Sequence, residues 1–106
     1  MSLTLFNACE NGDLFTVDFL IEDKVDINKL SPCGNSPLHL ACRHDQYDIV
    51  NLLIEKEANL NLEDSRHNTP LHIALKNGNL GICKLLIEKG VDINLKDNYG
   101  ETPLYI

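Results

Sequence analysis

A short pattern returns along the chain at a fixed interval of 33 residues, and this interval constrains the fold more than any other feature. Ser-Pro-Leu-His at 36–39 recurs as Thr-Pro-Leu-His at 69–72, and Thr-Pro-Leu returns at 102–104. Aligned along their whole length, residues 31–63 and 64–96 are identical at 13 of 33 positions. Self-similarity at this period indicates stacked structural units, each of which buries its apolar face against its neighbours.

The repeated pattern predicts the start of a helix in each unit. Ser36 and Thr69 stand where a helix takes a capping hydroxyl, and the proline that follows suits the first helical position because its missing N–H loses no bond there. Leu38, Ala41 and Cys42 then share one helical face at i, i+3 and i+4 spacing. The small alanine favours close approach between neighbouring helices.

A second helix and a turn complete each unit. Asn77-Gly78-Asn79 breaks the first helix, because glycine adopts the left-handed conformation that ends helices. We expect the second helices over roughly 47–56 and 80–89, with apolar residues again at helical spacing. Residues 91–94 and 97–100 then indicate an extended arm and a turn into the next unit.

These units resemble the ankyrin repeat, whose signature is T-P-L-H-x-A within a repeat of about 33 residues. The resemblance covers essentially the whole chain. It implies an all-α solenoid of antiparallel helix pairs, each with a projecting β-hairpin loop. The chain then forms a single domain, 1–106, divided into an N-terminal capping repeat, two full repeats and a truncated fourth: 1–30, 31–63, 64–96 and 97–106.

Three positions depart from the repeat where a glycine is expected. His67 stands where Gly34 stands in its own unit, and Lys24 and Glu57 stand where Gly90 does. Side chains other than glycine tolerate a positive φ poorly. We therefore expect the loop tip at His67 to be strained or reshaped, while two second-helix ends lack their usual glycine.

Composition excludes several functional classes. The net charge is −7, which disfavours binding to nucleic acid or to an anionic membrane. Net charge runs from −4 over 1–30 and −3 over 31–63 to +2 over 64–96. No apolar run is long enough to span a bilayer, and the N-terminus lacks the features of a secretory signal. We expect a cytoplasmic protein, leaving open the nucleus, or a host cell for an exported effector.

Candidate chemistry is sparse. His39 and His72 are repeat-equivalent, and stacked helices about 8–10 Å apart place them too far apart to share one metal ion. The resemblance instead implies that this histidine ties the loop to the helix by hydrogen bonds. The four cysteines lack C-x-x-C spacing, so we interpret them as reduced thiols. Phosphate-binding and nucleophile motifs are absent, and we predict neither enzymatic activity nor a cofactor.

The resemblance implies that a partner protein binds the concave face formed by the loop tips and the first helices. Candidate contact residues are those at the loop tips and at the exposed ends of the first helices, most of which differ between units. They are Asn35, Arg43, His44, Ser65, Arg66, Asn68, Lys76, Asn77, Asn98, Tyr99 and Glu101. Tyr99, Arg66 and Arg43 are the preferred hot spots, because tyrosine and arginine dominate interface energetics. The alternative for Tyr99 is that its ring simply packs along its own loop.

The sequence also fits other interpretations of its function. The repeats could be a targeting or scaffolding segment of a larger enzyme, channel or secreted effector whose activity lies elsewhere. The sequence stops at Ile106 inside the first helix of a fourth unit, which predicts a fragment of a longer, monomeric repeat protein. Otherwise a partner or a second copy covers that end, and the chain self-associates there. A metal or redox site is the third interpretation, against which the His and Cys spacings argue.

Overall fold

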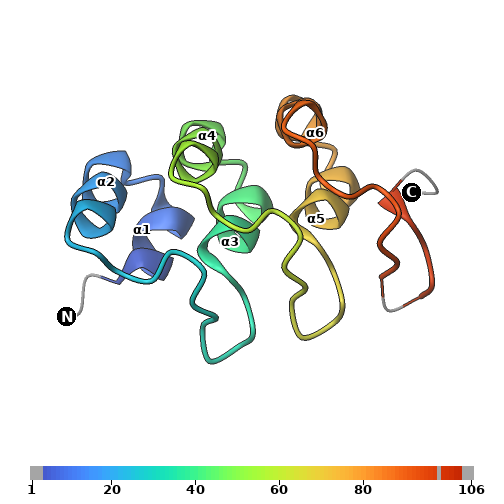
Figure 1. The fold of residues 1–106 in the computed structure, drawn as a ribbon, viewed down its shortest axis with the longest axis horizontal. Coiled ribbons are helices and arrows are strands. Elements are labelled where there is room, and N and C mark those ends of the chain that lie inside the picture. Colours follow the sequence, from blue (N-terminus) through green and yellow to red (C-terminus); the bar gives the residue numbers. More distant parts are fainter. Residues whose placement is uncertain (1–3, 98, 104–106) are drawn as a thin grey trace.

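The computed structural model describes residues 4–97 and 99–103 (Figure 1). Within these residues the chain forms three successive pairs of helices, with seven residues in each first helix and nine in each second helix. The pairs are α1 (Leu5–Asn11) with α2 (Leu14–Glu22), α3 (Pro37–Arg43) with α4 (Tyr47–Glu55), and α5 (Pro70–Lys76) with α6 (Leu80–Glu88). None of these helices has the length and apolarity needed to cross a bilayer.

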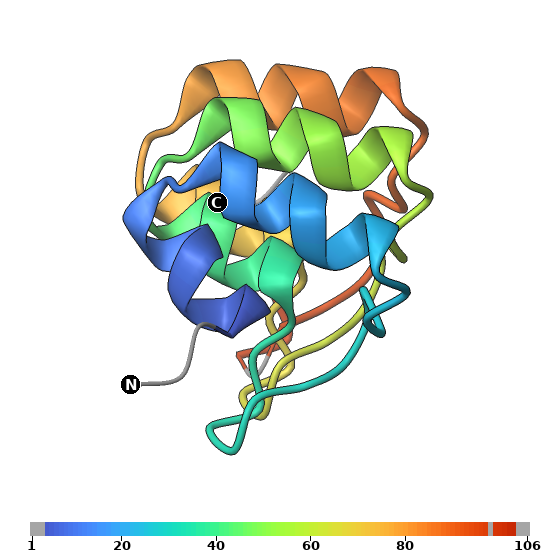
Figure 2. The ribbon, with the colours of Figure 1, turned by 90° about the vertical axis from the view of Figure 1, so that its left-hand side faces the viewer.

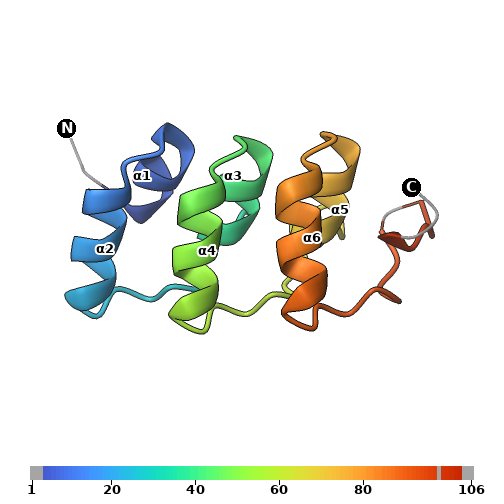
Figure 3. The same cartoon turned by 90° about the horizontal axis from the view of Figure 1, so that it is seen from above.

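The helices form two layers along an elongated molecule that measures 39 × 26 × 20 Å. One layer holds the first helices, α1, α3 and α5, and the other holds the second helices (Figures 1 and 3). Each helix packs on the other member of its pair and on the corresponding helix of the next unit. The expected all-α solenoid is confirmed.

Capping defines where the first helices begin. Ser36 Oγ accepts from the backbone N–H of His39 at 3.1 Å, and His39 Nδ1 accepts from the backbone N–H of Ser36 at 3.3 Å. Pro37 fills the first helical position, as predicted. The first unit lacks this proline and histidine, yet Thr4 alone caps α1 by accepting from the Asn7 N–H at 3.1 Å. A single capping hydroxyl is thus sufficient for a helix of the same length.

The second helices end one residue earlier than predicted, because the lysine assigned to the last turn is the capping residue. After α4, the Ala58 N–H donates to the Leu53 carbonyl and the Glu57 N–H to that of Ile54, each at 3.0 Å. This pair of bonds is the Schellman arrangement, which needs a left-handed residue at Glu57. The other second helices end in the same way.

The expected departures from glycine all adopt a positive φ. The angle is 64° at Lys24, 66° at Glu57 and 63° at His67. Asp45 is a fourth case, with φ of 56°, at the position that Gly12 and Gly78 occupy in the other units. The backbone therefore adopts the left-handed conformation at these four positions although none of them is a glycine.

The core is a continuous band between the two layers. Leu38, Ala41 and Cys42 are buried there, as predicted. Other apolar residues at helical spacing are buried with them: Ile49, Leu53, Leu71, Ala74, Ile82, Leu85 and Leu86. Leu52 and Leu75, which occupy the same helical spacing, are only partly buried and pack against the core. The fully buried Ala41 and Ala74 allow the first helices to stack closely.

The projecting loops are turns, and no strand occurs within the described residues, which corrects the β-hairpin expectation. In the loop over 64–68, the Asp64 N–H donates to the Asn68 carbonyl at 2.9 Å and the His67 N–H to the Asp64 carbonyl at 3.0 Å. The loop over 31–35 closes with the same two bonds. Five residues provide too few backbone pairs for a ladder.

Side chains join each unit to the next. His39 Nε2 donates to the Asn68 carbonyl of the following loop at 2.8 Å, because its Nδ1 is already an acceptor. Asn61 Oδ1 accepts from the Asp92 N–H at 2.8 Å. These bonds fix the spacing and orientation of successive loops.

Candidate functional site

The described residues of the predicted site lie on what we call the inner face, formed by the three loops (31–35, 64–68 and 97–101) together with the first helices. Viewed along the stack, the loops project from one side of the helix pairs (Figure 2). Asn98, one of the predicted residues, lies outside the described residues. The remaining ten divide among two recesses, the third loop and the end of α5.

A polar recess of about 340 Å³ lies between the first and second loops. We call it the tip recess, and it brings together five of the predicted residues. Its lining consists of Cys33, Asn35, Arg43, Asp64, Ser65, Arg66 and Asn68.

Arg43 links the two loops that form the tip recess. Its Nη1 donates to Asn35 Oδ1 at 3.2 Å, and its Nη2 lies 3.7 Å from Asp64 Oδ2. The side chain of Asp64 is 4% exposed, and its Oδ1 accepts the backbone N–H groups of Arg66 and Asn68, both at 2.8 Å. Arg43 therefore holds the loops in place as well as lining the recess. Asp64 was missing from the sequence-based set, although its place at the start of a loop was a signal.

Lys76 has the corresponding role in the next unit. Its Nζ donates to Asn68 Oδ1 at 3.1 Å and to Asp97 Oδ2 at 3.0 Å, and lies 5.7 Å from the centre of the Tyr99 ring. Asp97 also accepts the backbone N–H groups of Tyr99 and Glu101, at 2.8 and 2.9 Å. Desolvation alone would raise the pKa of Asp97. The hydrogen bonds from Glu101, Lys76 and Tyr99 together have the larger effect and lower this pKa to about 2.

Arg66 and Tyr99 are the predicted residues whose side chains remain most available. Arg66 is exposed at the mouth of the tip recess, and no described residue bonds its guanidinium group. Tyr99 is 78% exposed, with one ring face toward Lys76. Ser65, beside them, donates its hydroxyl proton to the Cys33 carbonyl at 3.3 Å.

A second recess of about 520 Å³, the inner groove, lies between α1, the first loop and α3. Three predicted residues, Asn35, Arg43 and His44, contribute to its wall. Glu10, Pro32 and Cys33 also line it. Sequence reasoning missed the rest of the lining, which is Thr4, Phe6, Asn7, Ser31 and Leu40. Phe6 occupies the position of the buried histidine in the other units, so the alignment of repeats could have singled it out.

The other predicted residues lie beyond these two recesses. Tyr99 and Glu101 line a hollow on the third loop. Asn77 Nδ2 donates to the Arg43 carbonyl at 3.1 Å, which connects the ends of α5 and α3. The structure thus aligns the predicted residues along the stack without gathering them into one pocket.

Burial makes three of the four cysteines and His39 less reactive. Burial, with a smaller contribution from Glu10, raises the pKa of Cys9 to about 12, and burial also raises the pKa of Cys42 and Cys83. Cys33 is the exposed free thiol. Burial lowers the pKa of His39, so its imidazole is neutral. Among the described residues, no three His, Cys, Asp or Glu side chains converge in a manner suited to a metal ion.

Stacked helix pairs, capped at each start and bearing polar loops on one side, define a helical repeat solenoid with a surface suited to molecular recognition. Residues 5–97 match the family model for ankyrin repeats, in three copies. The chain belongs to the ankyrin repeat family, whose repeats are in general protein–protein interaction modules. A comparison with curated protein sequences gave no significant match.

Proposed function

We propose that this chain is a non-catalytic interaction module that binds a partner protein on its inner face. The observation that carries the proposal is the tip recess, where the Arg43–Asp64 pair fixes two loops and leaves Arg66 exposed at the mouth. The four free cysteines suit a reducing compartment such as the cytoplasm.

Preorganisation supports binding at this surface. A mobile loop loses conformational entropy when a partner orders it, and this loss weakens binding. Here Asp64 and Asp97 each accept two backbone N–H groups of their own loop, and a cation from the preceding helix holds each carboxylate. The loops therefore present their tips in a fixed arrangement before any partner arrives.

The exposed groups indicate what the partner supplies. The Arg66 guanidinium can form a two-pronged pair with a carboxylate, and the free edge and outer face of Tyr99 can bury apolar area. In the inner groove, Phe6 and Pro32 offer an apolar surface for a side chain of the partner. A partner segment with an acidic residue opposite the tip recess and an apolar residue opposite the inner groove fits best.

The test is an affinity purification that compares two double variants. Arg66→Glu with Tyr99→Ala removes the two exposed inner-face side chains. Lys84→Glu with Tyr47→Ala makes the same change in charge and ring content on the second helices, where Tyr47 and Lys84 are also exposed.

Partners recovered from lysate with the parent chain and the Lys84/Tyr47 variant, but lost with the Arg66/Tyr99 variant, support the inner-face proposal. Loss of at least about tenfold in affinity is expected, since two hot-spot residues each contribute more than about 1 kcal/mol. Circular dichroism confirms that each variant is folded. Equal recovery of a purified partner by both variants would reject this site.

A further inference from the structure

The outer face, formed by the row of second helices α2, α4 and α6 (Figure 3), departs from the repeat at exposed positions. Framework positions recur in all three units, whereas these positions change in size and charge. The sets at equivalent positions are Leu14, Phe15 and Asp18 on α2, Tyr47, Asp48 and Asn51 on α4, and Leu80, Gly81 and Lys84 on α6. The outer surface is therefore different at each end of the stack.

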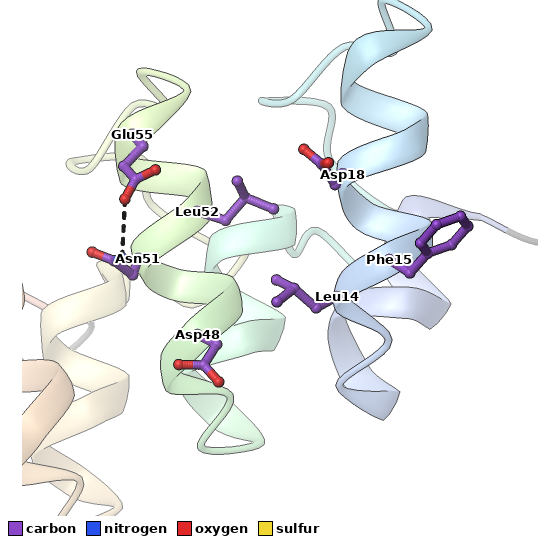
Figure 4. Close-up of a pocket in the computed structure, with 7 residues that line it drawn as sticks. All are labelled: Leu14, Phe15, Asp18, Asp48, Asn51, Leu52 and Glu55. Atoms are coloured by element: carbon purple, nitrogen blue, oxygen red, sulfur yellow. Dashed lines mark hydrogen bonds between the residues drawn. The ribbon is translucent and has the colours of Figure 1, made fainter.

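A groove of about 530 Å³ runs between α2 and α4 on this face. We call it the outer groove, and its lining is Leu14, Phe15, Asp18, Asp48, Asn51, Leu52 and Glu55. Leu14 and Leu52 point toward one another across the groove and form its apolar floor (Figure 4). The Phe15 ring points away from the centre of the groove and is 82% exposed.

Three carboxylates, those of Asp18, Asp48 and Glu55, also line the groove. Asp18 lies on the α2 wall, while Asp48 and Glu55 lie two turns apart on α4, about 10 Å along the helix axis. Asn51 donates to Glu55 at 3.1 Å, but no described residue donates a hydrogen bond to the carboxylate of Asp18 or Asp48.

One cation near the groove, Lys56, is already paired with Glu22, which is not among the groove-lining residues. Lys56, which follows α4, has its ammonium group 3.2 Å from Glu22, so its charge is already engaged. Glu22, Asp18 and Glu55 together raise the pKa of Lys56, in that order of effect, which agrees with a negative potential at this end of the groove.

We propose that the outer groove binds a short basic amphipathic helix of a partner protein, independently of the inner face. An apolar side chain of that helix packs on Leu14 and Leu52. Lysine or arginine residues two turns apart pair with Asp48 and Glu55, and Asp18 attracts a further cation from the opposite wall. A helix fits because the groove runs between two neighbouring helices of nine residues, where a third helix can seat its side-chain ridge.

The neighbouring pair α4 and α6 does not offer the same chemistry. In that pair, Gly81 and Lys84 on α6 stand where Asp48 and Asn51 stand on α4, so the α6 wall loses a carboxylate and gains a positive charge. Lys84 would repel a basic helix. The combination of apolar and acidic residues is therefore specific to the α2–α4 groove and does not recur between α4 and α6.

Two synthetic helical peptides are the probes. One carries lysines two turns apart on either side of a leucine, and the other carries glutamates in place of the lysines. Binding is measured by fluorescence anisotropy, and amide shifts in ¹⁵N-labelled protein locate the contact. Glu55→Lys is the test variant, and Glu88→Lys is its matched control, because both residues are exposed at the last position of a second helix.

The lysine peptide should bind, shift the amides of α2 and α4, and lose about tenfold in affinity with Glu55→Lys, where one attraction becomes a repulsion. Glu88→Lys should change the affinity less than about twofold, because α6 lies beyond α4 and salt screens its charge over the longer distance to the groove. The Arg66/Tyr99 double variant should bind the peptide as the parent does. Failure of the inner-face proposal would therefore leave this result intact.

Any of three results of the peptide experiments would overturn the proposal. They are no binding of the lysine peptide, equal binding of the glutamate peptide, and equal loss of affinity in the Glu55 and Glu88 variants. A concentration-dependent dimer in sedimentation experiments that Glu55→Lys abolishes would also overturn it, because a second copy of the chain would then be the occupant.

Discussion

The ammonium group of Lys76 lies 3.0 Å from the Oδ2 of Asp97 and joins the end of one unit's first helix to the loop of the next unit. The side chain of Asp97 has no exposed surface. Arg43 and Asp64 form the equivalent pair in the preceding unit, at 3.7 Å. The same cation and carboxylate positions thus organise both described loop boundaries, and the strength of each pair determines how firmly the loops are held.

Asp97 should make stability depend on pH in acid. Its pKa is lowered from the ordinary value of 3.8 to about 2, so the folded state holds the charged form more tightly than the unfolded state. The resulting stability is fully present above pH 3.8 and is lost as the pH falls toward 2. Urea denaturation across this range should show that Asp97→Asn removes part of this loss and is less stable at neutral pH. The variant Asp23→Asn, at an exposed position, is the control. If Asp97→Asn loses as much stability between pH 4 and 2 as the parent chain does, the prediction is wrong.

His39 should give a second pH dependence at higher pH. Burial lowers its pKa from 6.5, against the opposing effects of the Asn68 carbonyl and Asp64. Above pH 6.5 the ring is neutral in both states, and below it the unfolded chain takes up the proton first, so stability decreases as the pH falls.

The variant His39→Gln should therefore lose less stability than the parent between pH 7.5 and 5.5. At pH 7.5 it should be less stable by about 1–3 kcal/mol, because it disturbs buried hydrogen bonds to Ser36 and Asn68. Thermal and urea unfolding at both pH values measure the two effects. A parallel shift of both proteins with pH would show that another group dominates.

Two arginines near the tip recess should separate structural from binding roles. Arg43→Ala should lower the free energy of unfolding by about 1 kcal/mol, because it leaves the largely buried carboxylate of Asp64 without its cation. Arg66→Ala should change it by less than about 0.5 kcal/mol, since no described residue bonds its guanidinium. Urea denaturation of both variants provides the measurement. Equal destabilisation would mean that Arg66 also holds the loop.

The helices and the core could be predicted because their signals are local and repeat every 33 residues. A capping hydroxyl, a proline and apolar residues at helical spacing specify where α3 and α5 begin and which faces they bury. The positive φ at Asp45 was equally accessible, since the residue aligns with Gly12 and Gly78.

The site was harder to predict because its geometry arises between units. Lys76 and Asp97 are 21 residues apart, and the distance between them depends on how one unit stacks on the next. Sequence variation identified Arg43 and Lys76 as surface residues but could not show that loop carboxylates already engage them. The outer groove was missed for the same reason, because only the stacking of α2 on α4 brings Leu14 and Asp48 to one groove.

The ends of the second helices offer a matched pair of stability tests. Glu57 and Gly90 occupy the same left-handed position, with φ of 66° and 86°. A residue other than glycine destabilises the folded state by about 1–2 kcal/mol in this conformation, and a glycine avoids this cost. Glycine also increases the entropy of the unfolded chain, which offsets about 0.5–1 kcal/mol of the gain. Glu57→Gly should therefore stabilise the chain by about 0.5–1 kcal/mol.

Gly90→Ala should have the opposite sign. No atom lies within 4 Å of the added Cβ, so backbone conformation alone should destabilise the chain by about 1 kcal/mol. Urea denaturation of the two single variants and of the double variant should show additive effects, because the positions lie in different units. If Glu57→Gly destabilises the chain instead, the glutamate side chain contributes more to the folded state than its left-handed backbone costs.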